Sequence, residues 1–371
     1  MKKALLAAAA VLPFALANPA AAQKAGDKIA GSYICVFKDS VSRGNSQAEA
    51  NRSAQSVNAR VSHVYSTALR GFSANNMADQ AVERMKANNP NIAYCEQDSV
   101  ITVAPIHAAA PPGGGGTTQP LQETPWGIAR VNGGAAGSFA TAWVIDTGID
   151  FTHPDLNVDT ARSRNFVERE DSALDLNGHG THVAGTIAAY DNTIGVIGVA
   201  PGARVVAVRV LNRRGSGTNS GVIAGIDYVA ANGQAGDVAN MSLGGGVSTA
   251  LDTAVVNAAK GGVRFALAAG NESDNANNHS PARANGTNVY TVSAFGIGDK
   301  WASYSNYGNP PIDYAEPGSS IKSTWINGGY NTISGTSMAT PHLAGLLLTG
   351  LRAGGSVIGD PDGNPDIIGV K

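Results

Sequence analysis

The residues after position 126 alternate between short apolar runs rich in β-branched side chains and longer segments with helical spacing. The apolar runs are residues 139–145, 204–211, 238–243, 263–269 and 288–295, and the helical segments 220–232 and 248–260 lie between them. Strands that are apolar along nearly their whole length are typical of a parallel sheet covered by helices on both faces. The sequence therefore predicts an α/β fold, with its chemistry just beyond the carboxyl ends of the strands.

Polar residues follow two of these predicted strands directly. Asp146 lies in the segment VIDTG at the end of one apolar run, and Asn271 lies in AAGNE at the end of another. Two further motifs carry a histidine and a serine: His179 in NGHGTHVAGT and Ser337 in GTSMATP. Segment 338–349 after the serine is apolar, and we interpret it as a buried helix. Aspartate, histidine and serine together are the members of a hydrolytic triad.

A serine hydroxyl is a weak nucleophile at neutral pH and needs a base within hydrogen-bond reach. We expect His179 to take the proton of Ser337 and to pass it to a leaving amine. Asp146 would orient the imidazole and stabilise its charged form. The N-terminal amides of the helix after the serine would face the developing oxyanion, and the side-chain amide of Asn271 is the second expected donor.

Each of these residues also has an ordinary structural interpretation. An aspartate after a strand is usually a turn or cap residue, and a serine at a helix start is usually an N-cap. We expect His182 and His342 to be packed core histidines and His153 to be a loop residue. The chain order Asp, His, Ser differs from the order Ser, Asp, His of the α/β-hydrolases. Three motifs in this one order favour catalysis over three unrelated structural roles.

The segments around Asp146, His179, Asn271 and Ser337 resemble the subtilase family, the subtilisin and proteinase K group of serine endopeptidases. The similarity runs from residue 122 to about residue 352 and implies a subtilisin-like parallel sheet. It also implies that an extended polypeptide substrate pairs with the backbone at Gly215, Ser216, Gly217, Ser242, Leu243 and Gly244. Such strand addition derives affinity from main-chain hydrogen bonds. Ordinary turn glycines are the alternative at these positions.

The resemblance also implies a structural calcium ion, and no catalytic cofactor. Segment 190–196 is similar to the loop that wraps calcium in subtilisin. The ligands carried over are the side chains of Gln122, Asp155 and Asn192 and the main-chain carbonyls of Tyr190, Ile194 and Val196. All are oxygen donors, which suit a hard cation with about 6–8 ligands. A tight turn without a metal is the alternative. Asp313 matches a weaker cation position of the family.

Residues 1–22 have the features of a secretory signal peptide: a Lys2–Lys3 start, an apolar stretch and small residues at 20–22. The apolar stretch is shorter than the roughly 20 residues that span a bilayer. We therefore expect a secreted protein, extracellular or periplasmic, with no membrane contact after signal removal. The formal charge of −2 argues against a nucleic-acid partner that needs a basic surface.

Residues 24–104 read as a small βαββαβ unit of the ferredoxin-like α+β type. This unit resembles the subtilase propeptide, which implies an intramolecular inhibitor that assists folding. A linker at 105–121 contains PPGGGG, which cannot form regular structure. We expect cleavage within it, between Pro105 and Gly116, and a peptidase domain at 122–371.

Both cysteines, Cys35 and Cys95, lie in this small unit, on its predicted first and last strands. Those strands are antiparallel neighbours in a ferredoxin-like sheet, and export permits oxidation. A disulfide and two small buried thiols are both compatible with the sequence.

The hypothesis is a secreted, monomeric serine endopeptidase that works through an acyl-enzyme and is made as a self-processed zymogen. An inactive relative that serves as a binding module is disfavoured, because all triad members and Asn271 are present. An esterase is disfavoured because Met338 and Ala339 follow the serine, in place of the x-Gly of a nucleophile elbow. Only 19 residues follow Arg352, and segment 279–288, which lines the specificity pocket in relatives, does not match the family closely.

Overall fold

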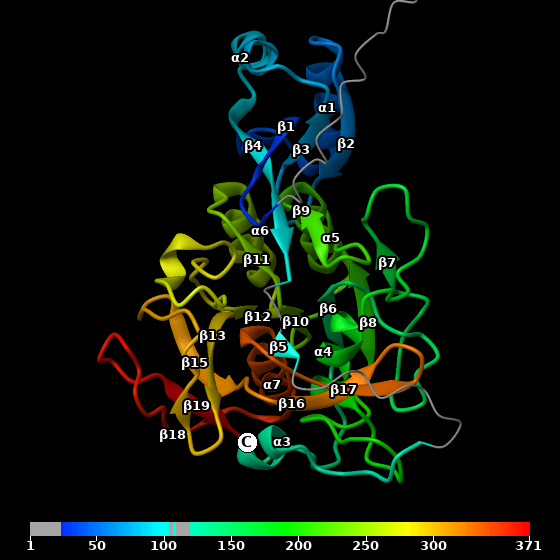
Figure 1. Ribbon diagram of the computed structural model, residues 1–371. Coiled ribbons are helices and arrows are strands. Elements are labelled where there is room, and N and C mark those ends of the chain that lie inside the picture. The colour runs from blue at the N-terminus through cyan, green and yellow to red at the C-terminus, as the bar shows by residue number, and fades with distance from the viewer. Residues whose placement is uncertain (1–23, 104–106, 109–118) are drawn as a thin grey trace, which may run out of the picture.

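The computed structural model describes residues 24–103, 107–108 and 119–371 and shows a small unit (24–103) above a large unit (119–371) (Figure 1). The predicted signal peptide, and the predicted processing region apart from residues 107–108, lie outside the described residues. Within the described ranges, no helix is both long enough and apolar enough to cross a membrane.

The small unit has the expected βαββαβ order. Its elements are β1 (Lys28–Phe37), α1 (Ser46–Gln55), β2 (Arg60–Tyr65), β3 (Gly71–Asn75), α2 (Asp79–Asn88) and β4 (Ile92–Thr102). The strands form an antiparallel sheet in the order β4-β1-β3-β2. Cys35 and Cys95 face each other across β1 and β4 and form a disulfide, which decides between the two alternatives left by the sequence.

The large unit is built on one long sheet. Its strands run in the order β18 (Arg352–Ser356), β19 (Ile367–Val370), β15 (Ile312–Pro317), β13 (Val289–Gly296), β12 (Arg264–Ala268), β10 (Val238–Met241), β6 (Ala142–Asp146), β8 (Val205–Arg209) and β7 (Arg164–Asn165). All pairings from β19 to β7 are parallel, whereas β18 and the short β14 (Lys300–Trp301) pair antiparallel. The predicted parallel sheet is confirmed.

Helices cover both faces of this sheet, as the apolar strands predicted. On β6, Trp143 and Ile145 pack with α5 (Asn219–Asn232) and α6 (Thr249–Ala259). Val144, which points the other way, packs with α4 (His179–Ala188) and α7 (Thr336–Thr349). A short helix α3 (Trp126–Arg130) precedes the sheet. Successive side chains of a strand point to opposite faces, so a buried strand needs apolar residues throughout.

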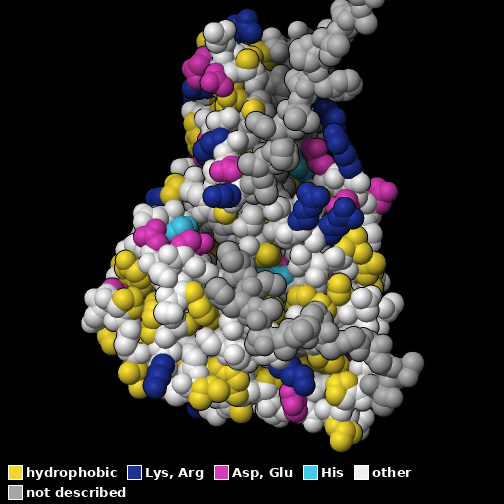
Figure 2. Space-filling model, in the orientation of Figure 1, with side chains coloured by type: hydrophobic (Ala, Val, Ile, Leu, Met, Phe, Trp, Pro, Cys, Tyr) yellow, Lys and Arg dark blue, Asp and Glu magenta, His cyan; other side chains and the backbone are white. Residues whose placement is uncertain are grey.

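The small unit packs against α5 and α6, and its Tyr65, Leu69 and Ile101 belong to the same core cluster as those helices. Figure 2 shows charged side chains gathered around this junction and few on the face of the large unit below it. Strand β4 then runs down between β9 (Ser216–Thr218) and β11 (Gly244–Gly245) of the large unit. One strand thus belongs to both units.

One region differs from the sequence expectation, and a second is one that the sequence left open. Inside the predicted linker, β5 (His107–Ala108) pairs with β17 (Gly329–Ser334), which forms a hairpin with β16 (Ile321–Trp325). Residues 107–108 form a strand because one edge of β17 is free to pair with them. No local pattern in the linker sequence indicates this pairing. The residues after Arg352, whose packing the sequence left open, form the hairpin of β18 and β19 and extend the sheet.

Candidate active site

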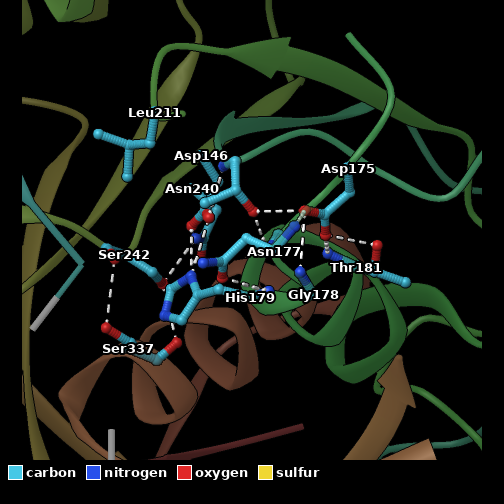
Figure 3. Close-up of polar contacts among 12 residues, drawn as sticks. Asp146, Asp175, Asn177, Gly178, His179, Thr181, Leu211, Asn240, Ser242 and Ser337 are labelled. Carbon is cyan, nitrogen blue, oxygen red and sulfur yellow. Dashed lines mark hydrogen bonds and ion pairs between the residues drawn. The ribbon is translucent and has the colours of Figure 1, made fainter. Parts of the chain in front are cut away.

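Asp146 and His179 form a buried acid–imidazole pair. Asp146 ends β6 and His179 begins α4, and neither side chain is exposed. The Nδ1 atom of His179 lies 2.8 Å and 3.0 Å from the two carboxylate oxygens of Asp146 (Figure 3). Gly178 before the histidine has φ +110°, and a Cβ there would lie 2.3 Å from the ring of Trp325. Only glycine can therefore bring the chain into α4 at this point.

Ser337 is the second residue of α7 and lies beside the ring of His179 (Figure 3). Its Oγ donates to the carbonyl oxygen of Ser242 at 3.2 Å. The Nε2 atom of His179 is buried and has no hydrogen-bond partner among the described residues. The expected serine–histidine hydrogen bond is therefore not made in this structure. A hydroxyl on a rotatable Cβ can turn to an available carbonyl, and Ser242 offers one.

Asn271 meets the helix that carries the serine. Its Oδ1 accepts hydrogen bonds from the main-chain N and the Oγ1 of Thr336, at 2.9 Å and 2.8 Å. Its Nδ2 is buried without a partner among the described residues. A Cβ on Gly335 would lie 2.9 Å from this Nδ2 and 3.7 Å from the main-chain N of Ser337. Two N–H donors thus flank one small space, which is the geometry that stabilises an oxyanion.

Four of the six residues predicted to bind substrate, Gly215, Ser216, Gly217 and Gly244, hold the chain's own strand β4, whereas Ser242 bonds to Ser337. Val103 N donates to Gly215 O at 2.9 Å. Thr102 is paired with both Ser216 and Gly244, and Ile101 with Gly217 and Gly245. Thr218, which pairs with Val100, and Gly245 extend this surface, and sequence reasoning missed both. Their only sequence signal is that each directly follows a predicted position.

A small cavity lies next to Ser337 and the end of β12. Its walls are mostly small or apolar, and Glu272 and His279 are the ionisable residues that line it. Asn306 fixes the Glu272 carboxylate, because its Nδ2 donates to Oε2 at 2.7 Å and its Oδ1 accepts from Glu272 N at 3.0 Å. His279 belongs to the segment that departs from the family pattern, and its Nε2 lies 3.2 Å from Asp274. Leu243, predicted to bind substrate, is also in this wall.

The residues predicted to bind calcium are brought together, but their side chains bond to one another. Asp155 accepts from Asn192 Nδ2 at 2.8 Å, from Val196 N at 3.2 Å and from Tyr330 Oη at 3.2 Å. Gln122 Oε1 accepts from Asn192 N. Burial raises the pKa of Asp155 to about 6. The side chains of Asp155, Asn192 and Gln122 meet at one loop, and each carries an oxygen of the kind that a hard cation takes. In this structure Asn192 turns its amide nitrogen to the carboxylate, and its Oδ1 accepts from Ile194 N at 2.7 Å.

The three histidines that the sequence predicted to be structural have main-chain partners. His182 Nε2 bonds to Ile321 O at 3.0 Å, and burial lowers its pKa to about 3. His342 Nδ1 bonds to Met338 O at 2.8 Å, and burial lowers its pKa to about 4. His153 bonds to Gly329 O at 2.9 Å. Asp313, the weaker cation candidate, accepts from Thr291 N at 2.9 Å. Among the described residues, no hydrogen bond joins any of these four side chains to Asp146 or His179.

Comparison with known proteins identifies the class that this fold and site define. The model of the subtilase family matches residues 141–352. The chain belongs to the subtilase family, and its enzyme class is that of a subtilisin-like serine endopeptidase.

Its similarity to individual proteins is high. It is 41% identical over 348 residues to alkaline serine exoprotease A of Vibrio alginolyticus, an alignment covering 89% of this chain and 62% of that protein. It is 39% identical over 372 residues to alkaline serine protease ver112 of Corniculantispora psalliotae, covering 93% and 89%. The crystal structure of a cold-adapted subtilisin-like serine proteinase is 44% identical, with a TM-score of 0.57, and the match covers 66% of this chain and 96% of that one.

Proposed function

We propose that the protein is a secreted endopeptidase in which Ser337 attacks a peptide carbonyl with His179 as general base. The observation that carries this proposal is the buried pair of Asp146 and His179, whose free Nε2 faces the serine (Figure 3). Relatives named extracellular serine proteinase, such as the one from Thermus sp. strain Rt41A at 39% identity, support secretion. The substrates are polypeptides, and the enzyme acts as a monomer.

The reaction begins when the Ser337 hydroxyl turns from Ser242 O towards His179 Nε2. His179 takes the proton as Oγ bonds to the substrate carbonyl carbon, and Asp146 stabilises the resulting imidazolium. The oxyanion accepts hydrogen bonds from Asn271 Nδ2 and Ser337 N. His179 then gives the proton to the leaving amine, which leaves an acyl-enzyme. Water, activated by the same imidazole, hydrolyses the ester and restores the serine.

A covalent serine-directed inhibitor tests this function. The protein purified from the medium should lose its activity on a protein substrate in proportion to labelling. Peptide mass mapping should place the label on Ser337, and N-terminal sequencing of the same sample should report the mature start. Labelling elsewhere, with activity retained, would contradict the proposal.

We also propose that residues 24–104 remain as an intramolecular inhibitor until cleavage between Pro105 and Gly116, a region largely outside the described residues. Strand β4 supports this, because it occupies the surface on which substrate would pair. Two of its carboxylates reach helix N-termini: Asp98 accepts from Ser220 N at 3.2 Å on α5, and Glu96 accepts from Ala250 N at 3.3 Å on α6. Carboxylates are favourable there because the helix dipole and the free N–H groups attract negative charge.

We expect the disulfide to stabilise the small unit against unfolding. Replacing Cys35 and Cys95 with serine should destabilise the small unit by about 4 kcal/mol, because the bridge closes a loop with a sequence separation of 60. Denaturant unfolding of the uncut precursor measures the change. Reductant added to the unaltered precursor is the matched control, because the chain has only these two cysteines. Equal unfolding midpoints with and without the bridge would contradict this role.

Calcium is proposed as a structural ligand held by Asp155, Asn192 and Gln122 with the carbonyls of residues 190, 194 and 196. When bound, it supplies positive charge that neutralises the Asp155 carboxylate and cross-links the loop to the N-terminal segment of the large unit. Calcium at a hundred times its Kd should stabilise the inhibitor-blocked enzyme by about 2.7 kcal/mol. This corresponds to about 5–10 °C in the unfolding midpoint.

Thermal unfolding in calcium and in chelator measures this effect. Asp155→Asn should unfold at the same temperature in both, whereas Asp313→Asn, which alters the weaker candidate position, should keep the full difference. An unaltered enzyme that is indifferent to chelator would show that the loop closes without metal through the hydrogen bonds described above.

A further inference from the structure

Asp175 is a buried carboxylate that joins the two segments carrying the acid and the base. It is 3% exposed and lies four residues before His179. Its Oδ1 accepts from Thr147 Oγ1 at 2.9 Å, and Thr147 directly follows Asp146. Its Oδ2 accepts from the N and the Oγ1 of Thr181, at 2.9 Å and 2.7 Å, in the first turn of α4. Figure 3 shows Asp175 beside Asp146 and the start of that helix.

This carboxylate is part of the N-terminal cap of helix α4. The N-cap residue, Gly178, has no side chain and must be glycine because of Trp325. The first helical N–H groups therefore need an acceptor from elsewhere. Asn177 Oδ1 accepts from His179 N at 3.2 Å, Thr147 Oγ1 from Gly180 N, and Asp175 Oδ2 from Thr181 N. Asp175 Oδ1 also orders the turn before the helix, because it accepts from Asn177 N at 2.8 Å and from Gly178 N at 2.9 Å. Five donors thus meet one carboxylate.

Thr147 and Asp175 together form a hydrogen-bonded bracket between the end of β6 and the first turn of α4. While Thr147 Oγ1 donates to Asp175, the same oxygen accepts from Gly180 N at 2.9 Å, in the residue after the base. The main-chain N of Thr147 donates to Asp146 Oδ1 at 2.7 Å. The carboxylate that bonds His179 and the helix that carries His179 are therefore fixed to the same threonine. A rotation of α4 relative to β6 would break bonds on both oxygens of Asp175.

We propose that Asp175 is a positioning residue for catalysis: it holds His179 in line with Asp146 through Thr147 and the first turn of α4. This proposal rests on the proposed role of His179 as the base. Nothing in it requires Asp175 to touch substrate. Because small misplacements of a base are costly to the reaction, we expect the effect in kcat and not in KM.

The test compares Asp175→Asn with Asp150→Asn as a matched control. Asp150 is also a buried carboxylate in the loop after β6, and it accepts from Thr152 N at 3.0 Å and from Gly328 N at 3.1 Å. Its carboxylate makes no hydrogen bond to residues 177–181 in the described part of the chain. Both variants replace one buried carboxylate by an amide.

Turnover is measured per active site, titrated with a covalent serine inhibitor, so that misfolded protein does not count. Asp175→Asn should lower kcat about 10- to 100-fold with KM within about threefold, and Asp150→Asn should keep kcat within about threefold. Unchanged per-site kcat in Asp175→Asn would overturn the proposal. If instead Ser337→Ala stayed active, the proposed function itself would fail, and the two failures are thus distinguishable.

Thr147 variants decide the matter if Asp175→Asn yields no processed enzyme. Thr147→Val removes the bracketing hydroxyl and should lower per-site kcat, whereas Thr147→Ser keeps the hydroxyl and should restore it to within about threefold. Where Asp175→Asn is processed, a double-mutant cycle with Thr147→Val should show losses that are less than additive, because the two side chains share the hydrogen bond between them. Equal kcat for the valine and serine variants, or fully additive losses, would contradict the bracket.

Discussion

Ser337→Ala is expected to accumulate as the uncut precursor and to lower turnover by about 10⁶-fold. This is the loss found when the nucleophile of a serine protease triad is removed. The alanine leaves His179 and Asp146 in place, but no atom remains to form the acyl-enzyme. Processing is followed by gel and N-terminal sequencing. Turnover is measured on a chromogenic peptide, with the processed form obtained by adding active enzyme to the purified precursor.

Ser323→Ala is the matched control for this variant. Ser323 is also fully buried, and its Oγ donates to His182 O, away from the bond-forming atoms. It should be processed and should turn over substrate within a few-fold of the unaltered enzyme. Normal self-processing of Ser337→Ala in a strain without other proteases would refute the assignment of the nucleophile.

Asn271→Ala should lower kcat by about 10²–10³-fold, the usual cost of losing one oxyanion donor. The Nδ2 group has no partner among the described residues, and in the proposed mechanism it gains one only when the oxyanion forms. An interaction that strengthens only in the transition state affects kcat and leaves KM nearly unchanged. Steady-state kinetics on one peptide substrate separate the two constants.

Asn271→Asp makes this experiment sharper. The carboxylate keeps an acceptor for Thr336 N, which bonds to Oδ1 in the structure, but has no N–H to donate. It should therefore lose at least as much activity as the alanine variant while retaining more stability. If the aspartate variant kept a tenth or more of the activity, the side chain would serve only to anchor α7, and the oxyanion role would be wrong.

The fold was predictable because its cause is local. Alternating apolar runs and helical segments set the parallel sheet, and the predicted strands match β6, β8, β10, β12 and β13 to within a few residues. The places of Asp146, His179 and Ser337 at the ends of their strand and helices were predictable for a related reason, since each lies in a motif whose glycines and small residues meet a local requirement. Gly178, for instance, must enter α4 with a positive φ against Trp325.

The rest of the site depends on contacts between distant segments that leave no local pattern. Asp175 reads as one more loop aspartate, because its partner Thr147 is 28 residues away. Tyr330 bonds to Asp155 across 175 residues, and nothing near either residue indicates it. The orientation of the Ser337 hydroxyl was also unpredictable, since it reflects a competition between Ser242 O and His179 Nε2 for one rotatable group.

The two carboxylates that β4 places at the starts of α5 and α6 have a consequence for the lifetime of the released enzyme. With residues 24–104 removed, as proposed, α5 and α6 would lose the carboxylates that accept from Ser220 N and Ala250 N. An enzyme molecule that unfolds afterwards would have to re-form both helix starts without these two carboxylates. We expect the lifetime of the processed enzyme to be set by its rate of unfolding and not by the equilibrium between the folded and unfolded states.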